Sequence, residues 1–150
     1  MKNQQIAVIG GGLMGHGIAL TFARANQYVT VFDPSAEMLA TVPKRVSESL
    51  ALLGVGEIGI ARALKKIELC SSMGSAVQDA QVVFEAVPEK LELKQAIFAE
   101  LEELAPEEAL LASNTSVIQI SKIMAGLKGR HRAMGTARCR PFSPAMILEI

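Results

Sequence analysis

The sequence is poor in the residue types that mark several large classes of protein. It has no tryptophan, one tyrosine and two cysteines among 150 residues, and its 15 basic residues are balanced by 15 acidic ones. Cys70 and Cys139 are too few for a disulfide framework or a closed zinc site, so we expect no bound metal and reduced, buried thiols. Zero net charge argues against binding nucleic acid or a membrane surface through bulk electrostatics.

Long hydrophobic runs are also missing. No apolar stretch approaches the roughly 18 residues of a membrane span, and the N-terminus lacks the apolar region and cleavage site of a secretion signal. Half of the residues are nevertheless hydrophobic and 20% are charged, which is the composition of a globular chain and not of a disordered one. We therefore expect one globular, cytoplasmic domain.

Short apolar runs alternate with helical stretches. The predicted strands are residues 6–9, 28–32, 67–70, 82–87 and 110–113, with weaker candidates at 132–136 and 146–150. The predicted helices are residues 13–25, 35–53, 60–66, a short one begun by Ser75 and Gln78, 88–104 with Glu89 in its first turn, and one from Ser116 and Gln119 to Met124. This order predicts an α/β fold of the Rossmann type, a doubly wound, mainly parallel sheet with helices on both faces.

A glycine-rich segment follows the first predicted strand. Residues 10–15 read GGGLMG and match G-x-G-x-x-G. Residues 54–59 have the same spacing but follow a helix, so we interpret them as a flexible turn. The first copy lies between a strand and a helix, the context that binds the diphosphate of a dinucleotide.

Each glycine of the first copy is predicted to have a different structural role. Gly10 allows a tight turn, Gly12 lets backbone approach the diphosphate, and Gly15 lets the helix pack against the strand. Leu13 and Met14 begin that helix, where free N–H groups and a partial positive charge favour phosphate.

Asp33 ends the second predicted strand. A carboxylate there accepts hydrogen bonds from ribose hydroxyls and repels a 2′-phosphate, which favours NAD over NADP. The alternative is a structural turn in which Asp33 only caps the helix that follows Pro34.

Three segments together, IAVIGGGLMGHGIA, VFDPS and FEAVPEKLELKQAIFAELEELAPEEALLASNTS, resemble the NAD-binding domain of L-3-hydroxyacyl-CoA dehydrogenases. The resemblance is close over residues 5–136 and looser to 150, and E-A-V-P-E-x-L-E-L-K and S-N-T-S are its most specific parts. It implies NAD as cofactor and oxidation of L-3-hydroxyacyl-CoA to 3-oxoacyl-CoA in fatty acid metabolism.

The resemblance also implies roles for side chains. Ala86, Val87, Glu89 and Lys94 would line the nicotinamide side of the cofactor site. Asn114 and Ser116 would lie near the nicotinamide and the substrate, with Ser116 bonded to the substrate oxygen. From the residues alone, Lys94 would be a solvated surface charge and Ser116 a helix cap.

The catalytic pattern of the family is broken in this chain. The family places its catalytic histidine in G-T-H-x-x-N-P and a glutamate in L-V-E-V. An ungapped alignment puts Ala137 at the histidine, Arg140 at the asparagine and Glu149 at the glutamate; a gapped one puts Arg140 at the histidine. Arginine is not a base near pH 7. We expect His16 to face solvent and His131 to lie at the opposite end of the sheet, so neither replaces the missing base.

The family adds a helical domain that closes over the substrate and forms the homodimer. We expect residues 1–150 to be the NAD-binding domain without it, and an acyl-CoA to be the partner. Two alternatives stay open. The chain is a non-catalytic NAD-binding module or truncated fragment, or it belongs to a dehydrogenase of another hydroxy compound such as carnitine, as the P-F-x-P of residues 141–144 indicates.

Overall fold

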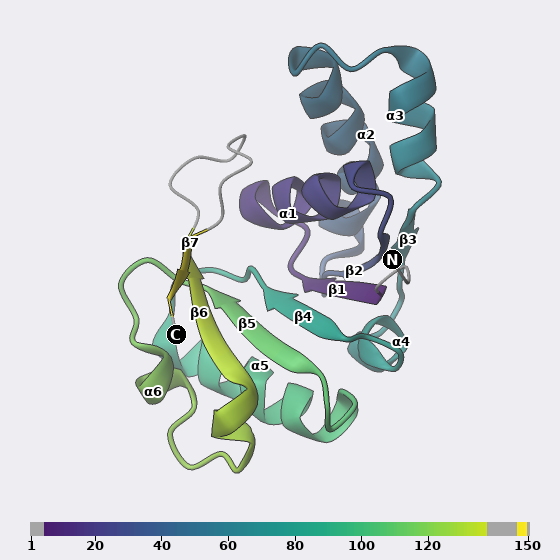
Figure 1. Ribbon diagram of the computed structural model, residues 1–150. Coiled ribbons are helices and arrows are strands. Elements are labelled where there is room, and N and C mark those ends of the chain that lie inside the picture. The colour runs from purple at the N-terminus through teal and green to yellow at the C-terminus, as the bar shows by residue number, and fades with distance from the viewer. Residues whose placement is uncertain (1–4, 138–146, 150) are drawn as a thin grey trace.

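A seven-stranded sheet forms the centre of the molecule (Figure 1). The computed structural model describes residues 5–137 and 147–149. The strands are β1 (Gln5–Ile9), β2 (Tyr28–Phe32), β3 (Ile67–Leu69), β4 (Val82–Glu85), β5 (Leu110–Asn114), β6 (Ala133–Ala137) and β7 (Ile147–Glu149), in the order β3-β2-β1-β4-β5-β6-β7. The first six pair in parallel, and β7 is antiparallel to β6. The predicted mainly parallel Rossmann-type sheet is confirmed.

Helices cover both faces of the sheet. They are α1 (Leu13–Arg24), α2 (Ala36–Leu52), α3 (Glu57–Leu64), α4 (Met73–Val77), α5 (Leu91–Leu104) and α6 (Ile120–Ile123), with a 3-10 turn at Gly129–Arg132. Strand β1 shows why its apolar run is unbroken: Ile6 and Val8 pack with the α1–α3 side, whereas Ala7 and Ile9 pack with the α4–α6 side. Within the described residues, the helices are too short or too polar to span a bilayer.

The strand order places a topological switch point between β1 and β4. From β1 the chain moves to β2 and β3 on one side, and then returns to β4 and continues to β5 and β6 on the other. The connections that leave the carboxyl ends of β1 and β4 therefore diverge, and ligands of open α/β sheets bind in the crevice between them.

Several predicted helix starts were wrong. Helix α5 begins at Leu91 because Lys90 is still extended, so Glu89 precedes the helix. Helix α4 is capped by Ser72, whose Oγ accepts a hydrogen bond from the N–H of Ser75 at 3.1 Å. The cap of α4 is therefore Ser72, and the predicted cap, Ser75, lies inside the helix.

The predicted capping box of Ser116 and Gln119 is also absent. Gln119 precedes α6 without a side-chain cap, and Thr115 Oγ1 instead accepts a hydrogen bond from the N–H of Ile118 at 3.0 Å. The second glycine pattern is a turn only at its start: Gly54 has φ of 74°, but Gly56 caps α3 and Gly59 lies inside that helix.

Candidate functional site

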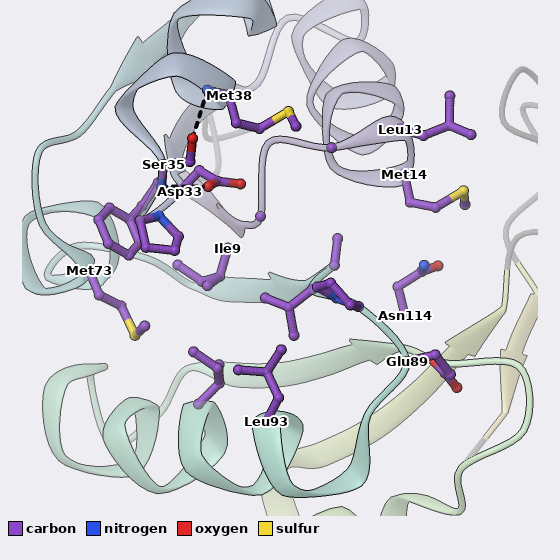
Figure 2. Close-up of a pocket in the computed structure, with 18 of the residues that line it drawn as sticks. Ile9, Leu13, Met14, Asp33, Ser35, Met38, Met73, Glu89, Leu93 and Asn114 are labelled. Carbon is purple, nitrogen blue, oxygen red and sulfur yellow. Dashed lines mark hydrogen bonds between the residues drawn. The ribbon is translucent and has the colours of Figure 1, made fainter.

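A cleft of about 1270 Å³ opens over the carboxyl ends of β1 and β4 (Figure 2). One end, called here the glycine-loop end, is lined from residues 10–15 and 33–38, and the opposite end, the β4–β5 end, from residues 86–89 and 114–117. Figure 2 shows Asp33 and Ser35 at the first end and Glu89 and Asn114 at the second. Apolar side chains such as Ile9, Met73 and Ile97 also line the cleft.

The backbone of the glycine loop (residues 10–15) is compatible only with glycine at two positions. Gly10 has φ of 107°, and a Cβ there would lie 2.7 Å from the carbonyl oxygen of Ala86. A Cβ at Gly15 would lie 1.7 Å from the carbonyl oxygen of Gly10. The loop therefore packs directly against the end of β4 and against its own helix, as the glycine pattern predicts.

Gly12 differs because it faces open space. No protein atom of the described chain lies within 4 Å of the position that a Cβ would take there. The N–H groups of Leu13 and Met14, which follow in the first turn of α1, have no acceptor in the described part of the chain. Free N–H groups at a helix start attract an anion, so this end suits a diphosphate.

Asp33 connects β2 to the glycine loop. Its Oδ2 accepts a hydrogen bond from the N–H of Gly11 at 2.8 Å, and its Oδ1 accepts one from the N–H of Ser35 at 2.8 Å. Ser35 caps α2, since its Oγ accepts a hydrogen bond from Met38 N–H at 3.1 Å. Asp33 is therefore not the helix cap, and its half-buried carboxylate lines the cleft with lone pairs left for a sugar hydroxyl.

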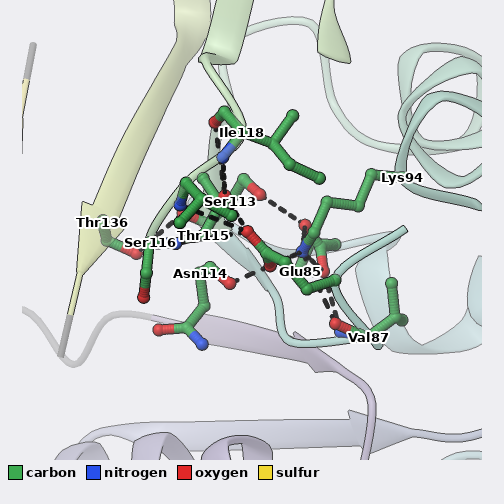
Figure 3. Close-up of polar contacts among 11 residues, drawn as sticks. Glu85, Val87, Lys94, Ser113, Asn114, Thr115, Ser116, Ile118 and Thr136 are labelled. Carbon is green, nitrogen blue, oxygen red and sulfur yellow. Dashed lines mark hydrogen bonds and ion pairs between the residues drawn. The ribbon is translucent and has the colours of Figure 1, made fainter. Parts of the chain in front are cut away.

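A buried charged cluster lies at the β4–β5 end (Figure 3). The side chains of Glu85, Lys94 and Ser113 are fully buried. Lys94 Nζ donates to Glu85 Oε1 and Oε2 at 2.8 and 2.9 Å, and Ser113 Oγ donates to Glu85 Oε2 at 2.5 Å. Lys94 is thus neither a surface charge nor a residue of the cleft wall: it lies behind that wall.

Glu89 joins the β4–α5 connection to the β5–α6 connection. Its Oε1 accepts hydrogen bonds from Thr115 Oγ1 and from the N–H of Ser116 at 3.3 Å, and its Oε2 lies 3.4 Å from Lys94 Nζ. Partial burial raises the pKa of Glu89, but the Thr115 hydroxyl and the Lys94 charge more than offset this and leave that pKa below its ordinary value. Glu89 is therefore an anion at neutral pH.

Ser116 occupies the boundary between two hollows. Together with Ala86, Val87 and Asn114 it lines the main cleft, and it also lines a second hollow of about 260 Å³ that reaches Gly135 on β6. Its side chain is exposed. A group bound in either hollow can therefore reach the Ser116 hydroxyl.

The structure brings together the backbone of the predicted catalytic segment. Ala137 ends β6, and Glu149 on β7 pairs with Gly135 of β6. Arg140 and Cys139 lie outside the described residues. The roles of these positions stay predictions.

The two histidines lie in different settings. The prediction that His16 faces solvent was wrong: it is 3% exposed, with Nδ1 3.0 Å from Gly12 O and Nε2 3.4 Å from Ser49 Oγ, because α1 packs against α2 on that side. His131 is in the 3-10 turn before β6, at the amino ends of the strands, as expected. Neither residue lines the cleft.

Sequence reasoning missed Glu85 and Ser113. The available signal was an acidic residue at the end of the apolar run VVFE, where a buried carboxylate requires a partner. It also missed Met73, Ile97 and Glu100, which line the cleft from the α4–α5 side.

The family model and the relatives that match this chain agree with one another. Residues 5–150 match the family model described as 3-hydroxyacyl-CoA dehydrogenase, NAD binding domain. The chain is 35% identical over 152 residues to the 3-hydroxybutyryl-CoA dehydrogenase of Mycobacterium tuberculosis, covering 98% of this chain and 53% of the relative. It is also 35% identical over 152 residues to the peroxisomal fatty acid beta-oxidation multifunctional protein MFP2 of Arabidopsis thaliana, covering 99% of this chain and 21% of that protein.

A solved structure shares the fold. The 3-hydroxybutyryl-CoA dehydrogenase of Escherichia coli superposes with a TM-score of 0.84 at 34% identity, over 94% of this chain and 30% of that one. The chain thus spans about half the length, or less, of the relatives it matches.

Proposed function

The chain belongs to the 3-hydroxyacyl-CoA dehydrogenase family and contains the NAD-binding domain of that family, and from this premise we propose how it works. NAD binds in the cleft with its diphosphate at the glycine-loop end and its nicotinamide at the β4–β5 end. The whole protein oxidises L-3-hydroxyacyl-CoA to 3-oxoacyl-CoA, a reaction of fatty acid oxidation. One observation carries the proposal: Leu13 and Met14, whose N–H groups have no acceptor in the described part of the chain, line the same cleft as Asp33.

Each cofactor-binding residue has an assigned part. Gly10, Gly12 and Gly15 shape the loop, and Leu13 and Met14 present N–H groups to the diphosphate. Asp33 accepts hydrogen bonds from the adenosine ribose. Ala86, Val87, Glu89 and Asn114 line the nicotinamide side, and Lys94 supports it from behind.

The oxidation removes a hydride from C3 of the substrate and a proton from the 3-hydroxyl. NAD, when bound, supplies the hydride acceptor. We assign Ser116 to hydrogen-bond the substrate oxygen because its hydroxyl lies between the cleft and the second hollow. Glu149 is assigned to orient the base that accepts this proton. Ala137, which aligns with the catalytic histidine of the family, cannot act as that base.

A second candidate function is that of an NAD-binding module without catalysis. The observation in its favour is Ala137, or Arg140 in the gapped alignment, where the family has its histidine. Without an imidazole at this point, the site lacks the side chain best suited to accept the hydroxyl proton near neutral pH. Binding of NADH without turnover is the property that separates the two candidates.

Titration of the protein with NADH, followed by cofactor fluorescence, tests the proposal. We expect saturable binding, and about a tenfold weaker affinity for Asp33→Ala, since the variant loses hydrogen bonds from the ribose to a charged group. Lys44→Ala on the exposed face of α2 is the control and leaves the affinity unchanged. Absence of binding by the unmodified protein would contradict the proposal.

Turnover of 3-hydroxybutyryl-CoA, and of carnitine, then distinguishes the substrates. Reduction of NAD by either compound supports an enzyme, and binding without reduction supports the module. Ala137→His in a chain that includes the helical domain tests the alignment: a gain in turnover places the base at residue 137, and no gain contradicts the ungapped alignment.

The remaining parts of the proposal concern the whole protein. We place residues 1–150 as the NAD-binding unit, with a helical domain outside them that forms a homodimer and closes over the acyl-CoA. We also propose a cytoplasmic location and no nucleic-acid or membrane partner. Cell fractionation and sedimentation of the full-length protein test these points. Recovery of the protein in peroxisomes, the compartment in the name of the Arabidopsis relative, would contradict the proposed cytoplasmic location.

A further inference from the structure

We propose that Glu85 is a positioning residue for one half of the cofactor. Through Lys94 and Ser113 it fixes the two loops that form the β4–β5 end, so it controls the binding of the nicotinamide half and not that of the adenosine diphosphate half. This inference rests on the proposed binding of NAD in the cleft. Glu85 itself does not line the cleft, so it would act through other residues.

In the described part of the chain, the Glu85 carboxylate bonds to Val87, which lines the β4–β5 end, and to Lys94 and Ser113, which lie behind that end. Oε1 accepts from the N–H of Val87 at 2.7 Å and from Lys94 Nζ at 2.8 Å. Oε2 accepts from Lys94 Nζ at 2.9 Å and from Ser113 Oγ at 2.5 Å. One carboxylate thus holds the connection that follows β4, the first turns of α5 and the end of β5 together.

Lys94 extends this control to the cleft wall. Its Nζ lies 3.5 Å from the carbonyl oxygens of Val87 and Asn114 and 3.4 Å from Glu89 Oε2. The Lys94 side chain is fully buried, so its charge needs a buried anion, and Glu85 is fully buried whereas the Glu89 side chain is 35% exposed. Without the Glu85 charge, the ammonium is attracted towards Glu89, which itself holds residues 115–117.

The glycine-loop end is held by other contacts. The N–H of Gly10 donates to Phe32 O at 2.8 Å, and the N–H of Gly11 donates to Asp33 Oδ2. Among the described residues, no hydrogen bond joins the side chain of Glu85, Lys94 or Ser113 to residues 10–15 or 33–38. Loss of the Glu85 charge therefore removes hydrogen bonds from the β4–β5 end and none from the glycine-loop end, which meets the end of β4 only through the packing of Gly10 on Ala86.

The test compares two ligands on one protein: NADH, which uses both ends, and ADP, which uses only the glycine-loop end. Glu85→Gln keeps the shape of the side chain and loses its charge. We expect the affinity for NADH to fall about tenfold, the size of one lost hydrogen bond to a charged group, and the affinity for ADP to stay within about twofold. Calorimetry of each ligand measures both.

Arg132→Met is the matched control. Arg132 is also a buried cation, but it donates to Pro106 O and Ala109 O, near the amino ends of the strands and at the opposite edge of the sheet from the cleft. It is expected to lower the thermal unfolding midpoint without separating the two affinities. A purely stabilising role for Glu85 predicts the same pattern for Glu85→Gln.

The outcomes are distinct. A selective loss of NADH affinity supports the proposal, whereas equal losses for NADH and ADP, or no loss, overturn it. If the unmodified protein binds neither ligand, the proposed function fails as well, and this is visible before any variant is made. If Glu85→Gln does not fold, Ser113→Ala removes one bond to Oε2 and keeps the ion pair; a selective loss of about threefold in NADH affinity supports the proposal, and its absence overturns it.

Discussion

The two ends of the cleft are held in place by different kinds of interaction. At the glycine-loop end the loop itself is fixed by backbone packing, because the positions of Gly10 and Gly15 leave no room for a Cβ. At the β4–β5 end the walls are connections between a strand and a helix, and they are held from behind by a buried cation and carboxylate. Shape restrains one end, and electrostatic attraction restrains the other.

This difference determines which changes disrupt the structure of each end. Backbone packing is insensitive to pH and salt but fails when a single methyl group is added. A buried ion pair tolerates small changes of shape, but it fails when one charge is removed and the other remains. The same cofactor site should therefore show two separate patterns of mutational sensitivity.

The largest expected effect is that of Gly15→Ala. The added methyl group would lie 1.7 Å from Gly10 O, so the loop must move away from its helix. We expect loss of NADH and ADP binding together, by about a hundredfold or through failure to fold. Fluorescence titration and circular dichroism measure the two outcomes.

Gly56→Ala is the control for that variant because it belongs to the second glycine pattern, and no atom of the described chain lies within 4 Å of the position that its methyl group would take. It is expected to leave folding and binding unchanged. Equal losses for both variants would show that the two patterns are not functionally different.

A smaller effect concerns acid. The pKa of Glu89 is lowered in the folded protein from an ordinary 4.5. A lowered pKa means that Glu89 stabilises the fold above pH 4.5 and that this contribution is lost as the pH falls through the folded value. Glu89→Gln lacks this contribution, so it should unfold at a lower temperature than the unmodified protein at neutral pH, by a few degrees at most. The two unfolding midpoints should converge below about pH 4.5. Parallel curves in thermal scans from about pH 7 to about pH 3 would contradict this.

The smallest effect is expected at His16, which touches the glycine loop through Gly12 O. His16→Val removes that hydrogen bond and should weaken NADH and ADP alike, by about two- to threefold. His16→Thr restores a donor to the carbonyl one turn back, as Thr21 shows by donating to Gly17 O at 2.8 Å on the same helix. Thr21→Val is the control. Rescue by threonine in calorimetric titrations sharpens the comparison, and failure of rescue assigns the loss to packing.

The two ends also differ in how much of them the sequence predicts. The glycine loop, Asp33 and the Ser35 cap lie within one strand–helix–strand unit and the turn that follows it, so spacing along the chain is enough to place them. Glu85 and Ser113 meet only because β4 and β5 pair in parallel with Glu85 opposite Ser113. No periodic pattern encodes that register, and the resemblance pointed to Lys94 without indicating its partner.

Local rules failed where a competing contact was available. Pro88 and Glu89 fit the start of a helix, but the chain bends at Glu89 and is extended at Lys90, while Glu89 bonds to residues of the β5–α6 connection. His16 is polar and near a loop, yet the packing of α1 on α2 buries it. In each case the decisive neighbour is distant along the sequence, 33 positions for Ser49 and 27 for Ser116.

The close approach of Gly10 and Gly15 has a kinetic consequence. Because the loop already touches its helix before any ligand arrives, no closure step precedes contact with the phosphates. The capture of ADP should then be a single encounter, with an observed rate that rises linearly with concentration and does not level off in stopped-flow mixing.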